Sequence, residues 1–199
     1  KNGLRIFLEP GQNSIPSNNL PNGIKLLNQT ELNENIGLTG LKCGCDYQWP
    51  VIINCASVNE ILAFKVEGRN NPPIELIMKA TAGKLHPTRV MIILGKNAKL
   101  DLLEVNLGSE FSAQSHFLEI HISEGAELNH GWLSLGLGNS KSLSNLAITQ
   151  EESSQYSLTS IQQGWLLGRL EPRIVQLKGN AQTTISGLQI SSNQEQLAT

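Results

Sequence analysis

The sequence has few aromatic side chains and no excess of charge of either sign. Phe, Trp and Tyr make up 5% of the 199 residues, and 15 Lys and Arg face 17 Asp and Glu, which gives a formal net charge of −2. A protein that binds nucleic acid usually carries a basic excess to hold the phosphate backbone. The composition therefore argues against nucleic acid as a partner.

Long apolar runs and a leader segment are also missing. The longest apolar stretches, such as 90–94 and 51–53, are far too short to span a membrane, so we expect no membrane association. The first residues, from Lys1 to Ile6, do not resemble a signal peptide. Because the chain does not begin with Met, we expect it to be a piece of a longer protein.

Cysteine is scarce, and the three residues present do not form a disulfide framework. An odd number of cysteines without a secretory signal indicates a reducing, intracellular compartment. Cys43 and Cys45 flank one Gly, and Cys55 follows later in the chain. Zinc sites usually have wider gaps and a fourth ligand, and cluster sites usually take four cysteines. We therefore predict packing for Cys55, within a buried strand at 52–56, and we assign no metal ligand, although the sequence leaves a role for the three thiols open.

What the chain does contain is period-two alternation separated by small-residue corners. Three apolar sets alternate with polar or small residues: Leu118, Ile120 and Ile122; Leu133, Leu135 and Leu137; Leu188 and Ile190. A Gly or Asn followed by Ala recurs at 95–98, 125–126 and 179–181, and the second interval is much longer than the first. Short strands joined by such corners predict an all-β chain folded as a solenoid, whose coils bury their apolar sides by stacking.

The segment 100–107 gives a sharper local prediction. Leu100 and Leu102 share one phase of alternation, whereas Leu103, Val105 and Leu107 share the other. One flat strand cannot bury both sets against one core, because a shift of one residue exchanges its faces. We therefore predict a bulge or a corner near Leu102.

The pattern divides the chain into an N-terminal appendage or cap, residues 1–48, and a solenoid core, residues 49–199. In the appendage we expect short strands at 4–8 and 23–27 around a turn-rich segment at 11–23, and one or two helical turns within 30–41. From residue 49 onward we expect mostly strands. Residues 57–60 have the spacing of a helix capping box, but the apolar run 61–66 favours a strand over a helix.

The histidines do not suggest a catalytic set. They are His86, His116, His121 and His130. No nucleophile elbow accompanies them, and the Gly-rich segment 136–139 lacks the Lys and the helix of a phosphate loop. We predict that His121 faces solvent, that His130 lies at a corner, and that Glu119 and His121 share a solvated strand face.

The tryptophans and one group of charged residues have structural interpretations. Trp132 and Trp165 are expected in the core or at an interface. Arg169 and Arg173 could bind a partner or an acidic group, but a loop at a solenoid corner in which both pair with Glu171 is favoured. We therefore assign no catalytic, cofactor-binding or metal-binding residue.

Beyond Trp49 an ordered series of short motifs resembles the SufB/SufD family of the SUF iron–sulfur cluster assembly system, and within it SufD. The series covers about three-quarters of the chain, whereas the N-terminal region adds little. Its members, in family order, are 53–56, 73–76, 89–100, 103–104, 118–120, 125–128, Tyr156, 164–169, 177–181 and 187–188.

The resemblance implies a right-handed parallel β-helix with a non-enzymatic scaffold role. Members of the family pair with a SufB subunit and bind the SufC ATPase, and the complex handles a nascent iron–sulfur cluster transiently. The resemblance implies no cofactor in this chain. A homodimer is a further possibility, and the cytoplasm or the plastid stroma is the expected location.

The family continues beyond this point with a segment that contains Thr and His and then with a helical part that docks SufC. The chain stops at 194–199, where that segment should begin, so no catalytic or metal residue is carried over. Stopping between coils would leave an unpaired strand, and we expect self-association through the C-terminal coil. The alternative functional class is a carbohydrate-active or other β-solenoid enzyme, which would need clustered carboxylates or aromatic rows. A hexapeptide-repeat acyltransferase would need a strict six-residue apolar repeat.

Overall fold

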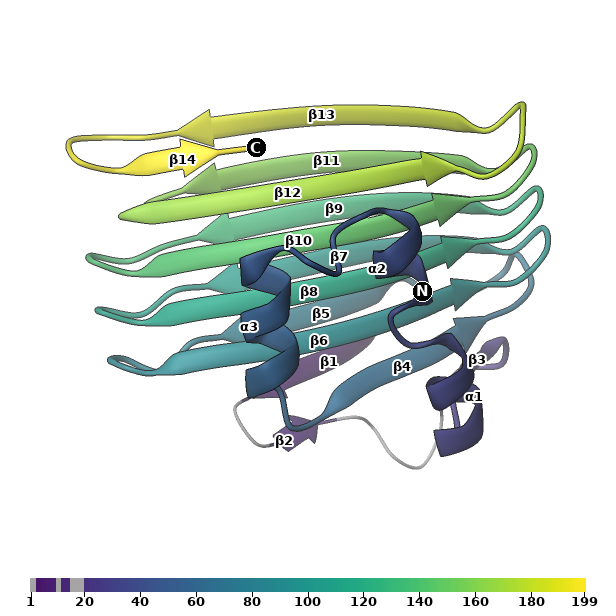
Figure 1. Ribbon diagram of the computed structural model, residues 1–199, viewed down its shortest axis with the longest axis horizontal. Coiled ribbons are helices and arrows are strands. Elements are labelled where there is room, and N and C mark those ends of the chain that lie inside the picture. Colours follow the sequence, from purple (N-terminus) through teal and green to yellow (C-terminus); the bar gives the residue numbers. More distant parts are fainter. Residues whose placement is uncertain (1–2, 10–11, 15–19) are drawn as a thin grey trace.

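The computed structural model describes residues 3–9, 12–14 and 20–199, and its fold is a β-solenoid of about five turns built mostly from strands. Two seven-stranded sheets face each other, and the chain passes from one to the other in every turn (Figure 1). The predicted all-β solenoid is confirmed. The first sheet contains, in spatial order, β13 (Gln182–Ile190), β11 (Gln155–Gln163), β9 (Glu127–Leu135), β7 (Lys99–Leu107), β5 (Ile74–Lys79), β1 (Leu4–Glu9) and β2 (Gln12–Ser14). The second contains β14 (Gln196–Ala198), β12 (Leu167–Gln176), β10 (Lys141–Gln150), β8 (Ala113–Ile122), β6 (Leu85–Leu94), β4 (Ile61–Val66) and β3 (Ile24–Leu26).

From β4 to β11, successive coils are related by a constant step along the chain, whereas the step is shorter at β12 and β13, where Lys141 pairs with Leu167 and Gln155 with Gln182. Leu76 pairs with Glu104, Glu104 with Trp132, and Trp132 with Ser160, so that the step has the same length each time. The coils are therefore more regular than the uneven spacing of the motifs at 95–98, 125–126 and 179–181 indicates. Equivalent small residues at the corner, Ala98 and Ala126, follow the same step and are fully buried.

The core lies between the two sheets and is formed by stacked rows of side chains. Ile92, Ile120 and Ile148 occupy equivalent positions in three neighbouring strands, and all three are fully buried. Burying one such side chain stabilises the fold by about 1.5–3 kcal/mol. Because every coil repeats these positions, a coil is stabilised mainly by its neighbours.

The N-terminal region extends both sheets. Strand β1 pairs in parallel with β5 and antiparallel with β2, whereas β3 pairs antiparallel with β4. The strands predicted at 4–8 and 23–27 are thus confirmed. Part of the turn-rich segment forms β2, and its residues 11 and 15–19 lie outside the described residues. The division of the chain at residue 48 stays a prediction.

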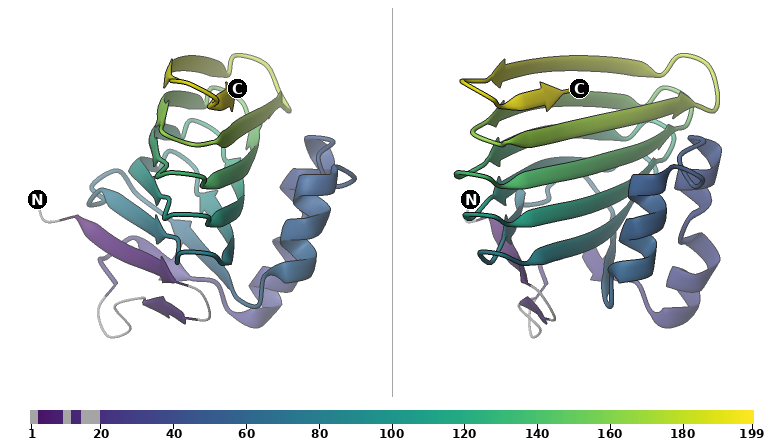
Figure 2. Two further views of the ribbon diagram at one scale, coloured as in Figure 1. Left: turned by 90° about the vertical axis from the view of Figure 1, so that its left-hand side faces the viewer. Right: turned by 60° about the vertical axis from the view of Figure 1, so that its left-hand side comes forward.

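Three helices follow β3 on the outer side of the second sheet, and the last two of them pack against it (Figure 2). Helix α1 (Gln29–Asn35) begins at Asn28, whose side chain accepts from the Glu31 N–H in a capping box. Helix α2 (Leu38–Lys42) completes the helical turns predicted within 30–41. Helix α3 (Trp49–Ser57) packs on β6, β8 and β10.

The strand predicted at 52–56 is wrong, because this segment lies within α3. Pro50 suits the first turn of a helix, and Pro50, Val51 and Asn54 form the buried face. The Asn54 amide donates to the carbonyl oxygens of Thr88 and Ser115 at 3.0 and 2.8 Å. These bonds fix the helix across two strands. The strand predicted at 61–66 is confirmed as β4.

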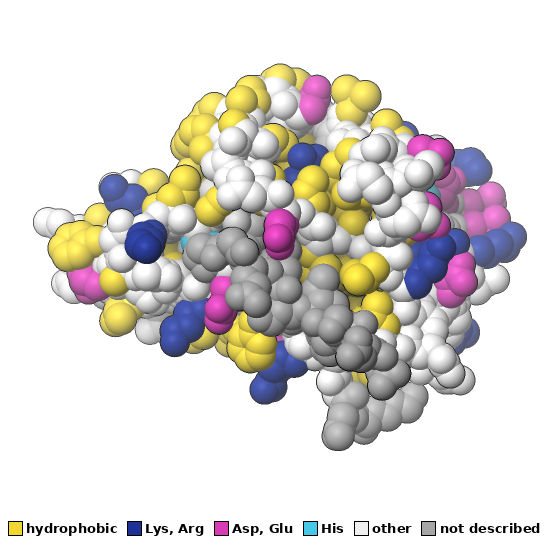
Figure 3. Space-filling view, turned by 90° about the horizontal axis from the view of Figure 1, so that it is seen from below, with side chains coloured by type: hydrophobic (Ala, Val, Ile, Leu, Met, Phe, Trp, Pro, Cys, Tyr) yellow, Lys and Arg dark blue, Asp and Glu magenta, His cyan; other side chains and the backbone are white. Residues whose placement is uncertain are grey.

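The described surface is mixed in charge. Viewed from the end of the molecule that carries β2, acidic and basic side chains are interspersed, and hydrophobic side chains also reach the surface (Figure 3). Arg5 with Glu75 and Lys25 with Glu31 are ion pairs of this region. None of the helices in the described ranges is long and apolar enough to cross a membrane.

Candidate functional site

Strand β7 runs straight through the position where a corner was predicted. Leu100, Leu102, Glu104 and Asn106 all face the interior, and Leu103 on the opposite face is partly exposed. The predicted bulge or corner near Leu102 is therefore wrong. The strand keeps one phase because two polar residues, Glu104 and Asn106, continue the inward row that the leucines begin.

Glu104 contacts two histidines inside the solenoid. Its Oε2 lies 2.9 Å from Nε2 of His116, and its Oε1 lies 3.0 Å from Nε2 of His130. His130 projects from β9, the neighbour of β7 in the same sheet, whereas His116 projects from β8 in the facing sheet. All three side chains are almost completely buried. This carboxylate therefore links the two sheets across the interior.

Two hydroxyl groups and an indole complete the surroundings of the histidines. His116 Nδ1 lies 2.7 Å from the Thr88 hydroxyl, and His130 Nδ1 lies 3.0 Å from the Tyr156 hydroxyl. The Trp132 ring lies beside both imidazoles, with centroid separations of 5.6 and 6.4 Å. Since each imidazole has one nitrogen toward the carboxylate and the other toward a hydroxyl, both rings are fixed in orientation. We call Glu104, His116, His130, Thr88 and Tyr156 the buried carboxylate cluster.

Electrostatics keep the carboxylate of this cluster ionised. Burial by itself would raise the pKa of Glu104, but the close approach of the His116 and His130 imidazoles opposes it, and the pKa lies at about 2. Burial, together with the nearby Glu104, raises the pKa of Tyr156. The cluster can thus hold a negative charge in the interior.

Polar side chains continue from this cluster into neighbouring coils. One row contains Asn106, Ser134 and Gln162, and a second, in the facing sheet, contains His86, Gln114 and Ser142. All six are buried, and five of them carry nitrogen or oxygen atoms without a hydrogen-bond partner in the described protein. One side of the interior is therefore polar, whereas the side that holds the isoleucine row is aliphatic.

The three cysteines are divided between buried and exposed positions. The Cys43 thiol donates to the Ile148 carbonyl oxygen at 3.4 Å, and the Cys45 thiol donates to that of Gly40 at 3.3 Å. Burial raises the pKa of Cys43 to about 11 and that of Cys45 to about 12. Cys55, predicted to be buried, is exposed on α3, because the inner face of that helix is formed by other residues. Within residues 3–9, 12–14 and 20–199, no three His, Cys, Asp or Glu side chains are placed to hold a metal ion.

The structure brings two of the four histidines, His116 and His130, into contact with Glu104. His130 lies in the middle of a buried strand and not at a corner, because its inward phase continues that of Leu128. His86 is buried in the polar row, and its pKa is lowered by burial and by the neighbouring His116. His121 is half-buried beneath α2 and not freely solvated, with Nδ1 3.0 Å from the Thr149 hydroxyl.

Glu119 and His121 do share one strand face, but helices cover it. Glu119 Oε2 lies 2.8 Å from Arg89, and its Oε1 accepts from the Gly40 N–H at 3.1 Å. The Arg89 guanidinium also lies over the Phe117 ring, 5.2 Å from its centroid. The predicted solvated pair is therefore wrong, and Glu119 fastens α2 to the sheet.

The charged group near residue 171 and the tryptophans follow the sequence-based prediction in part. Glu171 pairs with Arg169 and, at 2.9 Å, with Arg173. The predicted charge pairing is confirmed, but these residues lie in β12 and not in a corner loop. Gln48 donates to Glu171 at 3.0 Å, so the pairing also holds the segment before α3. Trp132 and Trp165 are buried, as predicted.

Sequence reasoning missed Glu104 as a functional candidate. A usable signal was present, because Glu104 and Asn106 share the phase of Leu100 and Leu102. Taking Leu103, Val105 and Leu107 as a second inward-facing set, and therefore expecting a corner, placed Glu104 and Asn106 outside the core. His116 and Glu104 also lie on strands of different sheets, and only the folded coil brings them together.

Comparisons with known proteins place most of the solenoid in one family. The family model described as "SUF system FeS cluster assembly, SufBD core domain" matches residues 76–199, which is more than half of the chain. No significant match was found among the curated proteins or among the solved structures.

Proposed function

Because the chain belongs to the SufBD core family, we propose that it is a non-catalytic scaffold subunit of the SUF iron–sulfur cluster assembly complex, most similar to SufD. The observation that carries this proposal is the match over residues 76–199. These residues begin in β5 and include the complete strands β6 to β14. The family relation and the stacked coils therefore concern the same part of the molecule.

The packing of the solenoid supports a scaffold role. The buried carboxylate cluster lies in a closed interior, where Glu104, His116 and His130 are almost completely buried. A substrate could not reach these groups without opening the coil. The rigid outer faces and the strand edges are the surfaces that such a subunit would offer to other proteins. In the described part of the chain, no observation favours a carbohydrate-active enzyme on this fold.

The proposed partners are a SufB-like subunit and a SufC-like ATPase, in the cytoplasm or the plastid stroma. In this proposal the iron–sulfur cluster is cargo of the complex, and this chain keeps no cofactor of its own. ATP hydrolysis belongs to the SufC-like subunit. The homodimer stays an alternative assembly.

The test is co-purification of the full-length protein with SufB-like and SufC-like proteins from the same organism. We expect a stoichiometric complex by size exclusion with light scattering, and ATPase activity only when the SufC-like subunit is present. Failure of both partners to bind, together with SUF complexes that assemble normally without this protein, would contradict the proposal.

A further inference from the structure

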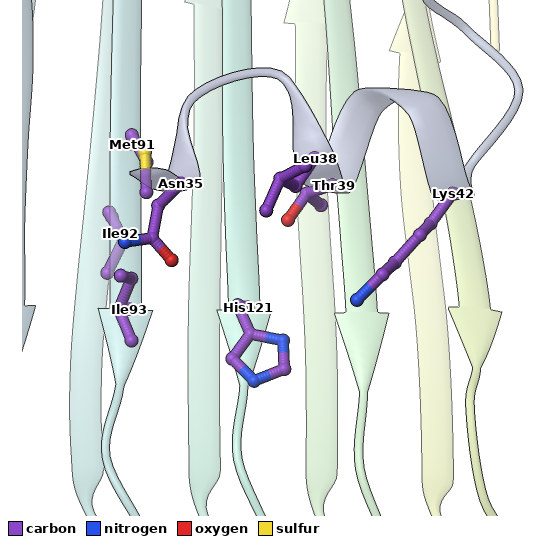
Figure 4. Close-up of a pocket in the computed structure, with 8 residues that line it drawn as sticks. All are labelled: Asn35, Leu38, Thr39, Lys42, Met91, Ile92, Ile93 and His121. Carbon is purple, nitrogen blue, oxygen red and sulfur yellow. The ribbon is translucent and has the colours of Figure 1, made fainter. Parts of the chain in front are cut away.

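The three helices α1, α2 and α3 form a helical segment outside the second sheet. A small pocket lies between this helical segment and the outer face of that sheet (Figure 4). Its volume is about 100 Å³. It is separate from the buried carboxylate cluster, which lies on the inner side of the same sheet. The pocket is lined by Asn35, Leu38, Thr39, Lys42, Met91, Ile92, Ile93 and His121.

Four polar side chains converge on this pocket from two directions. Lys42 and Thr39 extend into it from α2, and the His121 ring faces them from β8 (Figure 4). Asn35, at the end of α1, donates its amide N–H to the Glu31 carbonyl oxygen at 2.7 Å, which leaves its Oδ1 available. Among the described residues, Lys42 has no carboxylate within ion-pair distance.

His121 presents one hydrogen-bonding nitrogen to the pocket. Its Nδ1 lies 3.0 Å from the Thr149 hydroxyl, so Nε2 is the nitrogen left for another partner. Burial lowers the pKa of His121, and the imidazole is neutral at pH 7. In the tautomer in which Nδ1 accepts from the Thr149 hydroxyl, Nε2 carries the proton and is a donor.

The charge around the pocket favours an anion. The negative charge of Glu151 raises the pKa of His121, against the effect of burial. Glu151 is itself paired with Lys178, whose Nζ lies 3.2 Å from its Oε2. Lys42 therefore contributes a positive charge that no described residue neutralises. Lysine binds phosphate groups as a point charge, and hydroxyl and imidazole donors complete such sites.

We propose that this pocket binds a small oxyanion that carries a hydroxyl proton, of which hydrogen phosphate is the simplest example. Lys42, the Thr39 hydroxyl and His121 Nε2 donate to its oxygens, and its own O–H donates to Asn35 Oδ1. The four donors and acceptors thus match a ligand that has both kinds of group. The volume and the apolar wall formed by Met91 and Ile93 exclude a nucleotide.

The test is an NMR titration of the isotope-labelled protein with inorganic phosphate at constant ionic strength and pH 7. We expect saturable shifts of the amides of residues 38–42 and 121. Lys42→Gln is expected to weaken binding at least tenfold. Lys84→Gln is the matched control, because Lys84 is exposed, lies away from the pocket and loses the same charge. Its affinity should equal that of the parent protein.

Sulfate separates the proposed chemistry from general anion binding. Sulfate has no proton at pH 7 to donate to Asn35, so it should bind more weakly than phosphate. Linear shifts without saturation, equal loss in both lysine variants, or equal affinity for sulfate would each overturn the proposal. Melting temperatures equal to that of the parent protein show that the lysine variants are folded.

Discussion

At the scale of single residues, Glu104 is the most unusual side chain of the described structure. An ionised carboxylate away from water is costly unless charged or hydrogen-bonding partners surround it. Here the two imidazoles at 2.9 and 3.0 Å supply that compensation. Removing one partner of such a buried pair typically costs about 3–5 kcal/mol, because the remaining charge stays buried without compensation.

Glu104→Gln should therefore destabilise the protein by about 3 kcal/mol at pH 7, the lower end of the range for a buried pair because the amide keeps the shape. Since the folded pKa of Glu104 lies at about 2, below its ordinary value of 4.5, its stabilising effect is complete above about pH 5. The effect is lost as the pH falls toward 2. Urea unfolding of both proteins between pH 7 and 3 measures the difference, which should shrink at the acid end.

Glu75→Gln is the matched control for this experiment. Glu75 pairs with Arg5 at the surface, where an ion pair contributes about 0–1 kcal/mol. Its removal should change the unfolding free energy little at any pH. A Glu104→Gln protein as stable as this control would show that the buried cluster adds no stability.

The three thiols should differ in reactivity. Thiolates, not thiols, react with alkylating reagents, and the raised pKa values of Cys43 and Cys45 keep both protonated at pH 8. Both are also buried, whereas Cys55 is exposed. Iodoacetamide followed by peptide mass spectrometry should therefore modify Cys55 in the native protein and all three residues in urea. Native labelling of Cys43 or Cys45 at the rate of Cys55 would contradict the described packing.

The histidines show what sequence could and could not predict at this scale. Trp132 and Trp165 were predictable as core residues because large aromatic side chains are usually buried. The buried position of His130 was not predictable, because a His in phase with Leu128 is compatible with either a corner or an interior site where a charged partner offsets the cost of burial. The compensating partner, Glu104, lies one full coil earlier in the chain and is identified only once the register of β7 and β9 is known.

At the scale of elements, the helical segment is attached to the second sheet by a few specific contacts. Arg89 and Glu119 form an ion pair at 2.8 Å beneath it, and Glu119 also accepts the Gly40 N–H. Asn54 supplies amide bonds to two strands. The sheet does not need these helices for its own strand pairing, so the helical segment can loosen separately.

Glu119→Gln should loosen this segment without unfolding the solenoid. The variant leaves Arg89 largely buried without a carboxylate, and we expect amide hydrogen exchange of residues 38–57 to become about tenfold faster, which corresponds to about 1.4 kcal/mol. Hydrogen exchange with mass spectrometry measures this, and β8 to β11 should keep their protection.

Glu124→Gln provides the comparison, because Glu124 forms an exposed pair with Lys96. Its exchange pattern should match that of the parent protein. Uniformly faster exchange in all strands of the Glu119→Gln protein would show that the two layers unfold together.

Alternation predicted strands well but assigned their faces less well. Leu118, Ile120 and Ile122 do face the core. In β9, however, Leu133 faces outward while His130, Trp132 and Ser134 face inward. In this fold polar rows are tolerated inside, so apolar alternation alone does not identify the inner face. The helix at 49–57 was missed because its β-prone residues gave no stripe of three turns, and contact with the sheet decides its conformation.

At the scale of the whole molecule, the last coil presents an open surface. Every residue of β13 is exposed, including Ile185, Leu188 and Ile190. The backbone groups of a strand at a sheet edge are available to pair with another strand. The described molecule thus has a side suited to contact with another protein chain.

We expect the protein as given to self-associate through β13 at high concentration. Replacing Ile185 and Leu188 by Lys should shift it toward the monomer, because charged side chains oppose edge-to-edge pairing. Light scattering over a concentration series measures this. Leu137→Lys, at an exposed turn, should leave the association unchanged. A parent protein that stays monomeric at high concentration would contradict the prediction.

The constant step between coils also has a consequence for how this fold can change in length. Because equivalent positions recur at one fixed interval from β5 to β11, excising or duplicating one such unit between matching turns would shorten or lengthen the solenoid by one coil. All remaining inner side chains would stay inside. The loss of one residue within a strand would instead move all later side chains of that strand to the opposite face of the sheet. Adding or removing a whole coil, or a residue or two between strands as at β12 and β13, therefore keeps the inner faces, whereas losing one residue within a strand does not.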